Sequence, residues 1–318
     1  MTSKPKILII RLSSIGDIVL TTPVIRAISQ QLNAEVHFLT KPSFFPVLFD
    51  NPYVDVLHSY QDKDALKSIE FEAVIDLHHN LKTYFIKRSL KGKHSSFSKL
   101  NIEKWLLTTF KINRLPKKHI VERYLDAAAF LGVKNDGKGL DYFIAKDTQL
   151  QAPFSDLQNN KYIAVVVGGQ HATKILPAHK VIEVLSKISS SFVLVGGPED
   201  KQRAQQIISA LGKGINACGY LSLNQSALLV KNARLVISND TGMMHIAAAF
   251  SKKIISVWGN TVPDFGMYPY LVNEHSTIVE NEDLWCRPCS KIGYSKCPLG
   301  HFKCMNEINT SKIISLSE

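Results

Sequence analysis

Residues 6–32 read KILIIRLSSIGDIVLTTPVIRAISQQL. The apolar run Lys6–Arg11 has the length and composition of a buried strand, and Asp17–Leu32 carries apolar residues at helical spacing. The turn between them is polar and contains a glycine. A buried strand that leads through a polar turn into an amphipathic helix is the first half of a βαβ unit, so this stretch indicates a parallel sheet with helical crossovers.

The same alternation continues along the chain. In the first half it predicts strands at Glu35–Thr40, Val54–His58 and Ala73–Leu77. It predicts helices at Lys82–Leu90, Ile102–Phe110 and His119–Leu131. A Gln- and Asn-rich stretch at residues 146–161 is typical of a linker. After it the pattern restarts, with predicted strands at Tyr162–Val167, Phe192–Val195, Leu235–Ile237 and Lys253–Trp258. The helices predicted between them begin at Pro177 or span Glu199–Leu211, Leu223–Lys231 and Gly242–Phe250.

This double alternation predicts an α/β protein with two doubly wound, Rossmann-like domains, residues 1–150 and 151–318, that face one another across a cleft. The 318 residues are 45% hydrophobic and 20% charged, which excludes disordered, collagen-like and coiled-coil classes. No 18 apolar residues run together, and the run Ile7–Ile10 is too short for a signal-peptide core. We therefore expect a soluble, cytoplasmic protein. The dinucleotide, P-loop, serine-hydrolase and zinc-protease motifs are all missing.

The positive charge of the chain is concentrated in one segment. The net charge is +11, and Lys82–Lys118 contains eleven Lys or Arg residues against one acid, Glu103. Such a segment suggests an anionic partner, namely nucleic acid, a phosphorylated glycolipid or an anionic membrane surface. The alternative is an ordinary solvated face.

Asp17 follows the first predicted strand, at the start of a helix. One interpretation is a helix cap that complements the helix dipole. The other is a carboxylate at the ligand-binding edge of the sheet, placed to take a proton from a substrate hydroxyl.

Three turns of the second half have a composition suited to a nucleoside diphosphate. The turn at Asp240-Thr241-Gly242 offers free amides at a helix start, with His245 one turn further on. The turn Gly168-Gly169-Gln170 adds backbone donors, and Lys174 adds a positive charge. After Gly196-Gly197-Pro198, either Glu199 or Asp200 could accept hydrogen bonds from ribose hydroxyls.

Four cysteines fall close together near the C-terminus: Cys286, Cys289, Cys297 and Cys304. The first pair has the spacing of a zinc knuckle, but the second pair does not repeat it. Structural zinc, reduced or partly buried thiols, and disulfides all stay open. Cys218 is expected to be a core thiol.

Four segments together resemble glycosyltransferase family 9, the ADP-heptose:lipopolysaccharide heptosyltransferases. They are IIRLSSIGDIVLTTP from Ile9, HIVERY from His119, SNDTGMMHIAAA from Ser238, and the tail CRPC…CPLGHFKCM from Cys286. The segments span nearly the whole chain in the expected order.

The resemblance implies a GT-B fold, with the acceptor bound by the N-terminal domain and the sugar nucleotide by the C-terminal one. It implies inverting transfer of heptose from ADP-heptose to the inner core of lipopolysaccharide, with no metal or other cofactor needed for catalysis. Asp17 matches the catalytic base. The residues that match the donor-binding positions are Lys174, Asp240, Thr241, Gly242 and His245, and Glu199 falls near a carboxylate that binds the ribose. Gln170 is also expected to bind the donor, because of its place in the turn after the strand that ends at Val167.

On the acceptor side we expect contacts from Ser13, Ser14, Asn80, Lys82 and Arg123. The partners would be an ADP-sugar, a lipid A-linked oligosaccharide and the inner face of the cytoplasmic membrane, which the protein would contact peripherally, with no nucleic acid. Two alternatives remain at this point. One is a related GT-B enzyme that uses a different nucleotide sugar. The other is a basic protein that binds anions or nucleic acid and has a zinc-stabilised tail.

Overall fold

The computed structural model describes residues 4–318, which form two compact units. Within the described residues, unit 1 comprises 4–100 with Lys118–Ala145, and unit 2 comprises Asn101–Lys117 with Lys146–Glu318. Unit 1 thus ends at Ala145, and Lys146 begins the second part of unit 2. The segment Asn101–Lys117, expected in the first domain, groups with the second unit instead.

This segment carries helix α4 (Asn101–Phe110) and is fixed to unit 2 by polar contacts. The ammonium group of Lys111 donates hydrogen bonds to the carbonyl oxygens of Cys286 (3.2 Å) and Pro288 (2.8 Å). The amide of Asn113 donates to Asp264 at 2.5 Å. Sequence patterning gave no sign of these contacts, because the partners lie about 150 residues or more further along the chain.

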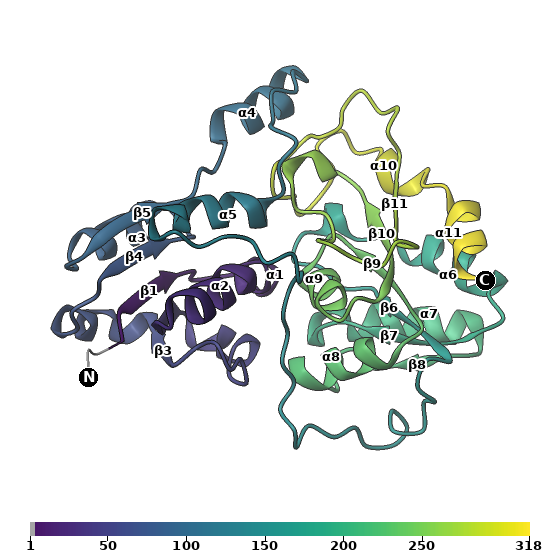
Figure 1. Cartoon of the computed structure of the whole chain (residues 1–318). Helices are drawn as coiled ribbons and strands as arrows, with labels where there is room; N and C mark the ends of the chain where they lie inside the picture. Colours follow the sequence, from purple (N-terminus) through teal and green to yellow (C-terminus); the bar gives the residue numbers. More distant parts are fainter. Residues whose placement is uncertain (1–3) are drawn as a thin grey trace. The chain divides into compact units, whose positions relative to one another are not determined.

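Unit 1 is built on a five-stranded parallel sheet of order β3-β2-β1-β4-β5 (Figure 1). Its strands are β1 (Lys6–Ile10), β2 (Glu35–Thr40), β3 (Val56–Ser59), β4 (Ala73–Asp76) and β5 (Lys93–Ser96). Its helices are α1 (Ile15–Val19), α2 (Thr22–Leu32), α3 (Leu81–Arg88), α5 (Ile120–Ala128) and the 3-10 helices Pro42–Val47, Tyr60–Ser68 and Ala129–Leu131. The strand β5, with the polar sequence KHSS, was not predicted because an edge strand lacks the apolar run that marks a buried one.

The helix predicted over Asp17–Leu32 is interrupted, and α1 and α2 are separate. Pro23 lies in the first turn of α2, where its missing N–H costs nothing. The hydroxyl groups of Thr21 and Thr22 donate to the carbonyl oxygens of Ile18 and Val19, both at 2.7 Å. The Thr22 hydroxyl thus takes the place of the N–H that Pro23 cannot offer to the carbonyl of Val19, and the Thr21 hydroxyl adds to the backbone bond from its own N–H to Ile18, so both side chains stabilise the break.

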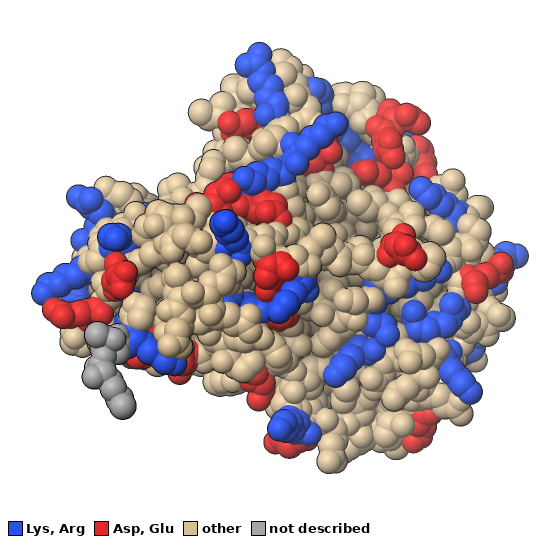
Figure 2. Space-filling view, in the orientation of Figure 1, with Lys and Arg blue, Asp and Glu red and all other residues tan. Residues whose placement is uncertain are grey.

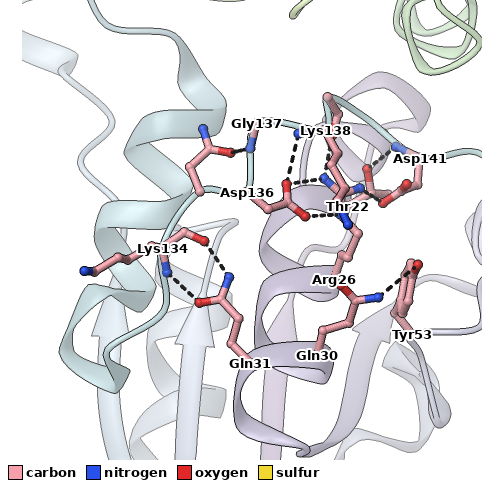
Figure 3. A network of polar contacts seen from close by, with 12 residues as sticks. Thr22, Arg26, Gln30, Gln31, Tyr53, Lys134, Asp136, Gly137, Lys138 and Asp141 are labelled. Carbon is pink, nitrogen blue, oxygen red and sulfur yellow. Dashed lines mark hydrogen bonds and ion pairs between the residues drawn. The ribbon is translucent and has the colours of Figure 1, made fainter.

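A buried arginine on α2 ties the end of unit 1 to this helix (Figure 3). Arg26 donates to both carboxylate oxygens of Asp136 at 2.7 and 2.8 Å, to the carbonyl of Gly139 at 2.9 Å, and to Asp141. The backbone N–H of Asp141 in turn donates to the Thr22 hydroxyl at 2.9 Å. Bidentate charge-assisted contacts of this kind fix orientation as well as distance, so the segment after α5 is held on α2.

Unit 2 contains a six-stranded parallel sheet of order β11-β10-β9-β6-β7-β8 (Figure 1). Its strands are β6 (Tyr162–Val166), β7 (Ser191–Val195), β8 (Ile215–Asn216), β9 (Leu235–Asn239), β10 (Lys253–Trp258) and β11 (Thr277–Glu280). Its other helices are α6 (Ala178–Lys187), α7 (Lys201–Leu211), α8 (Leu223–Asn232), α9 (Gly242–Ala249), α10 (Lys303–Asn306), α11 (Thr310–Ser317) and three 3-10 turns, Ala172–Lys174, Pro198–Asp200 and Pro263–Phe265. The sequence missed the edge strands β8 and β11 and the two C-terminal helices.

Over residues 4–318, no helix is both long enough and apolar enough to cross a bilayer.

Candidate functional site

The first candidate site lies at the carboxyl ends of β1 and β4, which are neighbours in the unit 1 sheet. Asp17 occupies the third position of α1, and Ser14 is the N-cap. The Ser14 backbone N–H and hydroxyl both donate to Oδ2 of Asp17, at 3.3 and 2.9 Å. Asp17 therefore takes part in capping the start of α1, and this contact occupies one of its two carboxylate oxygens.

The other oxygen of Asp17 is held by a buried arginine that the sequence interpretation overlooked. Nη2 of Arg11 lies 2.6 Å from Oδ1 of Asp17. The same guanidinium donates to the carbonyls of Ser13 (2.7 Å) and Leu77 (2.6 Å) and to the hydroxyl of Tyr124 (3.0 Å). Four acceptors from four places in unit 1 fix its plane. An arginine directly after an apolar strand was the available signal, since a buried guanidinium needs a carboxylate partner.

These contacts set the protonation state of Asp17. Burial alone would raise the pKa of Asp17, but the charge of Arg11 and the hydrogen bonds from Ser14 outweigh it and hold the pKa below its ordinary value. The carboxylate is therefore ionised at neutral pH, and 20% of its side chain is exposed. An ionised, oriented and partly accessible carboxylate can accept a proton from a bound hydroxyl group.

A second acid, Asp76, is fully buried where β4 ends. Its Oδ1 accepts hydrogen bonds from the backbone N–H groups of His78 (3.0 Å) and His79 (2.7 Å). Its Oδ2 has no hydrogen-bond partner within the described residues. Burial, together with the charges of Arg11 and Lys99, lowers the pKa of His78 to about 4, so its ring is neutral at physiological pH.

The residues predicted to contact an acceptor differ in their exposure and in the contacts that they make. Ser14 and Ser13 contact Asp17 and Arg11 as described, and Lys82 is exposed on α3. The side-chain oxygen of Asn80 accepts from the N–H of Thr83 at 2.9 Å, so it serves as the N-cap of α3. Arg123 is buried on α5, 3.4 Å from the carbonyl oxygen of Ser98. Its contact with an acceptor stays a prediction.

The second candidate site lies in unit 2, at the carboxyl ends of the neighbouring strands β6, β9 and β10. Nζ of Lys174 lies 2.6 Å from Oδ2 of Asp240, which also accepts a hydrogen bond from the Thr261 hydroxyl at 2.8 Å. Asp240 is buried and Lys174 keeps 18% of its side chain exposed. The carboxylate thus holds the ammonium group at this edge of the sheet. Thr261 was not predicted as a site residue, because its partner Asp240 lies in a different turn, the one after β9.

Helix α9 begins in the same place. Thr241 is its N-cap, with no side-chain cap bond, and both Thr241 and Gly242 are partly exposed. The amide of Asn239 donates to the carbonyls of Val166 and Gly168, both at 3.2 Å, and so joins the ends of β6 and β9. Free N–H groups at a helix start beside a lysine are suited to bind an anion. His245, predicted to face a ligand, is buried within α9.

The turn after β7 carries Glu199 and Asp200, the two acids between which the sequence did not decide. Asp200 is buried, accepts from the Gly197 N–H at 3.0 Å and pairs with Arg203 at 2.6 Å. Burial raises the pKa of Asp200. Glu199 is exposed and lines an open groove of about 480 Å³ with Pro198, Lys201, Gln202, Gln205 and Tyr220. Of the two carboxylates, only that of Glu199 is accessible to a ligand.

Gly168 is required by the same arrangement, because a Cβ there would lie 2.2 Å from Oδ2 of Asp200. Gln170, two residues further on, is exposed. Its predicted role in binding a ligand is therefore sterically possible.

The zinc prediction at Cys286, Cys289, Cys297 and Cys304 is not supported. Within residues 4–318, no group of three or more His, Cys, Asp or Glu side chains is arranged to hold a metal ion. All four cysteines are free thiols and line a cavity of about 20 Å³. Burial raises the pKa of Cys304 to about 12, so this free thiol is protonated at neutral pH.

Comparison with known proteins shows the family to which this chain belongs. Residues 61–299 match the sequence model of glycosyltransferase family 9 (heptosyltransferase), which is most of the chain. This chain belongs to glycosyltransferase family 9. Lipopolysaccharide heptosyltransferase 1 of Campylobacter coli is 26% identical over 288 residues, which cover 80% of this chain and 84% of that protein.

Solved structures of family 9 enzymes share the fold. The family 9 glycosyltransferase of Veillonella parvula DSM 2008 has a TM-score of 0.79 at 22% identity, over 100% of this chain and 97% of that one. An E. coli heptosyltransferase solved with ADP has a TM-score of 0.70 at 18% identity, over 98% of this chain and 100% of that one. This family 9 chain is therefore a glycosyltransferase of the GT-B class. The alternative of a basic, non-enzymatic binding protein is set aside.

Proposed function

We propose that this enzyme transfers heptose from ADP-heptose to an inner-core sugar of lipopolysaccharide, with inversion at the anomeric carbon. Unit 1 would bind the acceptor and unit 2 the sugar nucleotide. The observation that carries the proposal is the Asp17 carboxylate, which Arg11 and Ser14 keep ionised and oriented at the edge of the sheet. The family membership and the heptosyltransferase relatives support the choice of donor.

In this mechanism Asp17 accepts the proton of an acceptor hydroxyl as its oxygen bonds to the anomeric carbon. The bond from that carbon to the diphosphate oxygen breaks on the opposite face, and ADP leaves with the electron pair. Lys174 and the free N–H groups at the start of α9 would stabilise the charge that develops on the diphosphate. We propose that no metal is needed, because these groups supply the positive charge themselves.

The proposed acceptor is a lipid A-linked oligosaccharide at the inner face of the cytoplasmic membrane. Its phosphates and acidic sugars would suit the basic segment that contains Lys82. The predicted acceptor contacts of Ser13, Ser14 and Asn80 lie at the Asp17 edge of unit 1 or directly after β4.

The test compares the wild-type enzyme with Asp17→Asn. We expect the substitution to lower kcat by about 10²- to 10⁴-fold, as for loss of a general base, and to leave the affinity for ADP unchanged. Asp62→Asn, which alters an exposed carboxylate of unit 1, is the control. Transfer that survives in Asp17→Asn at the wild-type rate would refute the mechanism.

Titration calorimetry with ADP, UDP and GDP, each with and without EDTA, tests the donor. Preference for ADP that EDTA does not change is expected. A preference for UDP or GDP would keep the fold and the base but replace the donor, and a loss of binding in EDTA would contradict metal independence. Proton NMR of the product's anomeric centre tests inversion.

A further inference from the structure

Helix α3 of unit 1 exposes its apolar stripe. Leu81, Tyr84 and Phe85 are 72%, 46% and 63% exposed, and their spacing of i, i+3 and i+4 puts them on one face of the helix. The opposite face carries Ile86, which packs into the unit 1 core. Surface helices of soluble proteins normally present charged residues outward, so an apolar face on the outside indicates a partner.

Basic residues are concentrated in the segment of sequence that carries this stripe. Residues 77–102 contain Lys82, Lys87, Arg88, Lys91, Lys93 and Lys99 and no Asp or Glu. Arg88 lies one further turn along the exposed face, and it forms no ion pair with any of residues 4–318. The pair between Lys91 and Glu70, at 3.5 Å, is exposed at both ends and therefore contributes little. Figure 2 shows Lys and Arg side chains, with some Asp and Glu among them, over the end of unit 1 that carries α3 and β5 in Figure 1.

We propose that the exposed face of α3, formed by Leu81, Tyr84, Phe85 and Arg88, docks on an anionic lipid bilayer. Leucine and aromatic side chains enter the boundary between headgroups and acyl chains, while lysine and arginine heads remain at the phosphate level. Charge complementarity favours lipid over a second copy of the chain, because two such basic faces would repel one another.

The position of α3 connects this surface to the catalytic edge. The helix begins five residues after Asp76, and the carbonyl of the intervening Leu77 accepts a hydrogen bond from Arg11 at 2.6 Å. The docking helix and the Asp17 site thus belong to one compact unit. This inference rests on the proposed function only in that a membrane-anchored acceptor gives docking its purpose.

Co-sedimentation of the full chain with vesicles tests docking without any enzymatic readout. The probes are phosphatidylcholine vesicles and phosphatidylcholine vesicles that contain phosphatidylglycerol. We expect binding to the anionic vesicles, and at least about tenfold weaker binding for Leu81→Ser/Phe85→Ser. Arg88→Gln should weaken binding about fivefold, the usual contribution of one cation near an anionic surface. Phe49→Ser is the matched control, since Phe49 is 64% exposed in unit 1 but lies outside α3.

Circular dichroism confirms that each variant is folded. Equal binding of wild type and the double variant would overturn the proposal, as would no binding of the wild type to anionic vesicles. A wild-type dimer that the double variant dissociates, seen by light scattering, would show that the face is a self-association surface instead. Because none of these measurements uses the donor, failure of the heptosyltransferase proposal would leave their outcome unchanged.

Discussion

Nη2 of Arg11 lies 2.6 Å from Oδ1 of Asp17, and this contact has two opposed effects on the proposed base. It keeps the carboxylate ionised, because the guanidinium lowers the pKa of Asp17. It also weakens the carboxylate as a proton acceptor, because a lower pKa means a lower proton affinity. A weak base suits a displacement in which the hydroxyl proton is transferred late, after the bond to the sugar has begun to form. Arg11 is thus a positioning residue, since it acts on the substrate through Asp17.

The first prediction concerns the pH dependence of transfer in Arg11→Met. Without the guanidinium, the pKa of Asp17 should rise, so the base becomes protonated at a higher pH. The acidic limb of kcat/KM against pH should therefore move to higher pH. Tyr124→Phe, which removes one acceptor from Arg11 but keeps its charge, should move the limb much less. An unchanged limb in Arg11→Met would mean that Asp17 is not the group that titrates.

The second prediction concerns donor affinity. Lys174→Met should weaken ADP binding by roughly tenfold or more, because a charge-assisted contact to the diphosphate is lost. Lys180→Met is a close control, since Lys180 also pairs with a carboxylate, that of Glu183 at 2.8 Å, and is 16% exposed. Calorimetry with ADP measures both. Equal affinities of the two variants would place the diphosphate elsewhere.

The third prediction concerns acid stability. Hydrogen bonds from Arg26 lower the pKa of Asp136 from 3.8 to about 2. A carboxylate with a lowered pKa stabilises the fold fully above its unfolded pKa, near 4, and this contribution disappears as the pH falls towards 2. Asp136→Asn should therefore destabilise unit 1 by about 2 kcal/mol at neutral pH, a penalty that shrinks as the pH falls towards 2 and is lost below it.

Urea unfolding of wild type and Asp136→Asn across this pH range tests it, with Asp62→Asn as the exposed control. Burial raises the pKa of the neighbouring Asp141, so its contribution to the free energy of unfolding changes with pH in the opposite direction. Because Asp141 is present in both proteins, this contribution largely cancels in the difference between wild type and variant. A penalty that stays constant from neutral pH to pH 2 would contradict the assignment.

Local patterning was sufficient for the two parallel sheets and for the carboxylate at the start of α1, whereas the GT-B class was implied by the resemblance to family 9. Buried strands such as β1 and β9 are marked by apolar runs, and polar turns after them mark the edge where ligands bind. The pattern failed where the decisive contact is distant in sequence. The partners of Arg11 include Leu77 and Tyr124, and those of Lys111 are Cys286 and Pro288, so no local window contains both members of either pair.

The break between α1 and α2 is a different kind of failure. Its signal was present in Thr21, Thr22 and Pro23, but the apolar spacing continues across it and favoured one long helix. The choice between Glu199 and Asp200 could not be made from sequence, because adjacent acids have the same local pattern. Burial separates them: Asp200 is enclosed by the turn that it stabilises, and Glu199 is left facing solvent.

That separation gives the last prediction. If Glu199 accepts hydrogen bonds from the ribose, Glu199→Gln should weaken ADP binding about tenfold, the usual loss for a hydrogen bond to a charged group. The same substitution should have little effect on the binding of the 2′,3′-dideoxy analogue, which lacks those hydroxyls. Asp200→Asn should instead lower the melting temperature, because it weakens the contacts to Gly197 and Arg203. If Glu199→Gln weakens ADP and the analogue equally, the carboxylate does not contact the ribose, and the groove beside Tyr220 would have to bind another part of the donor.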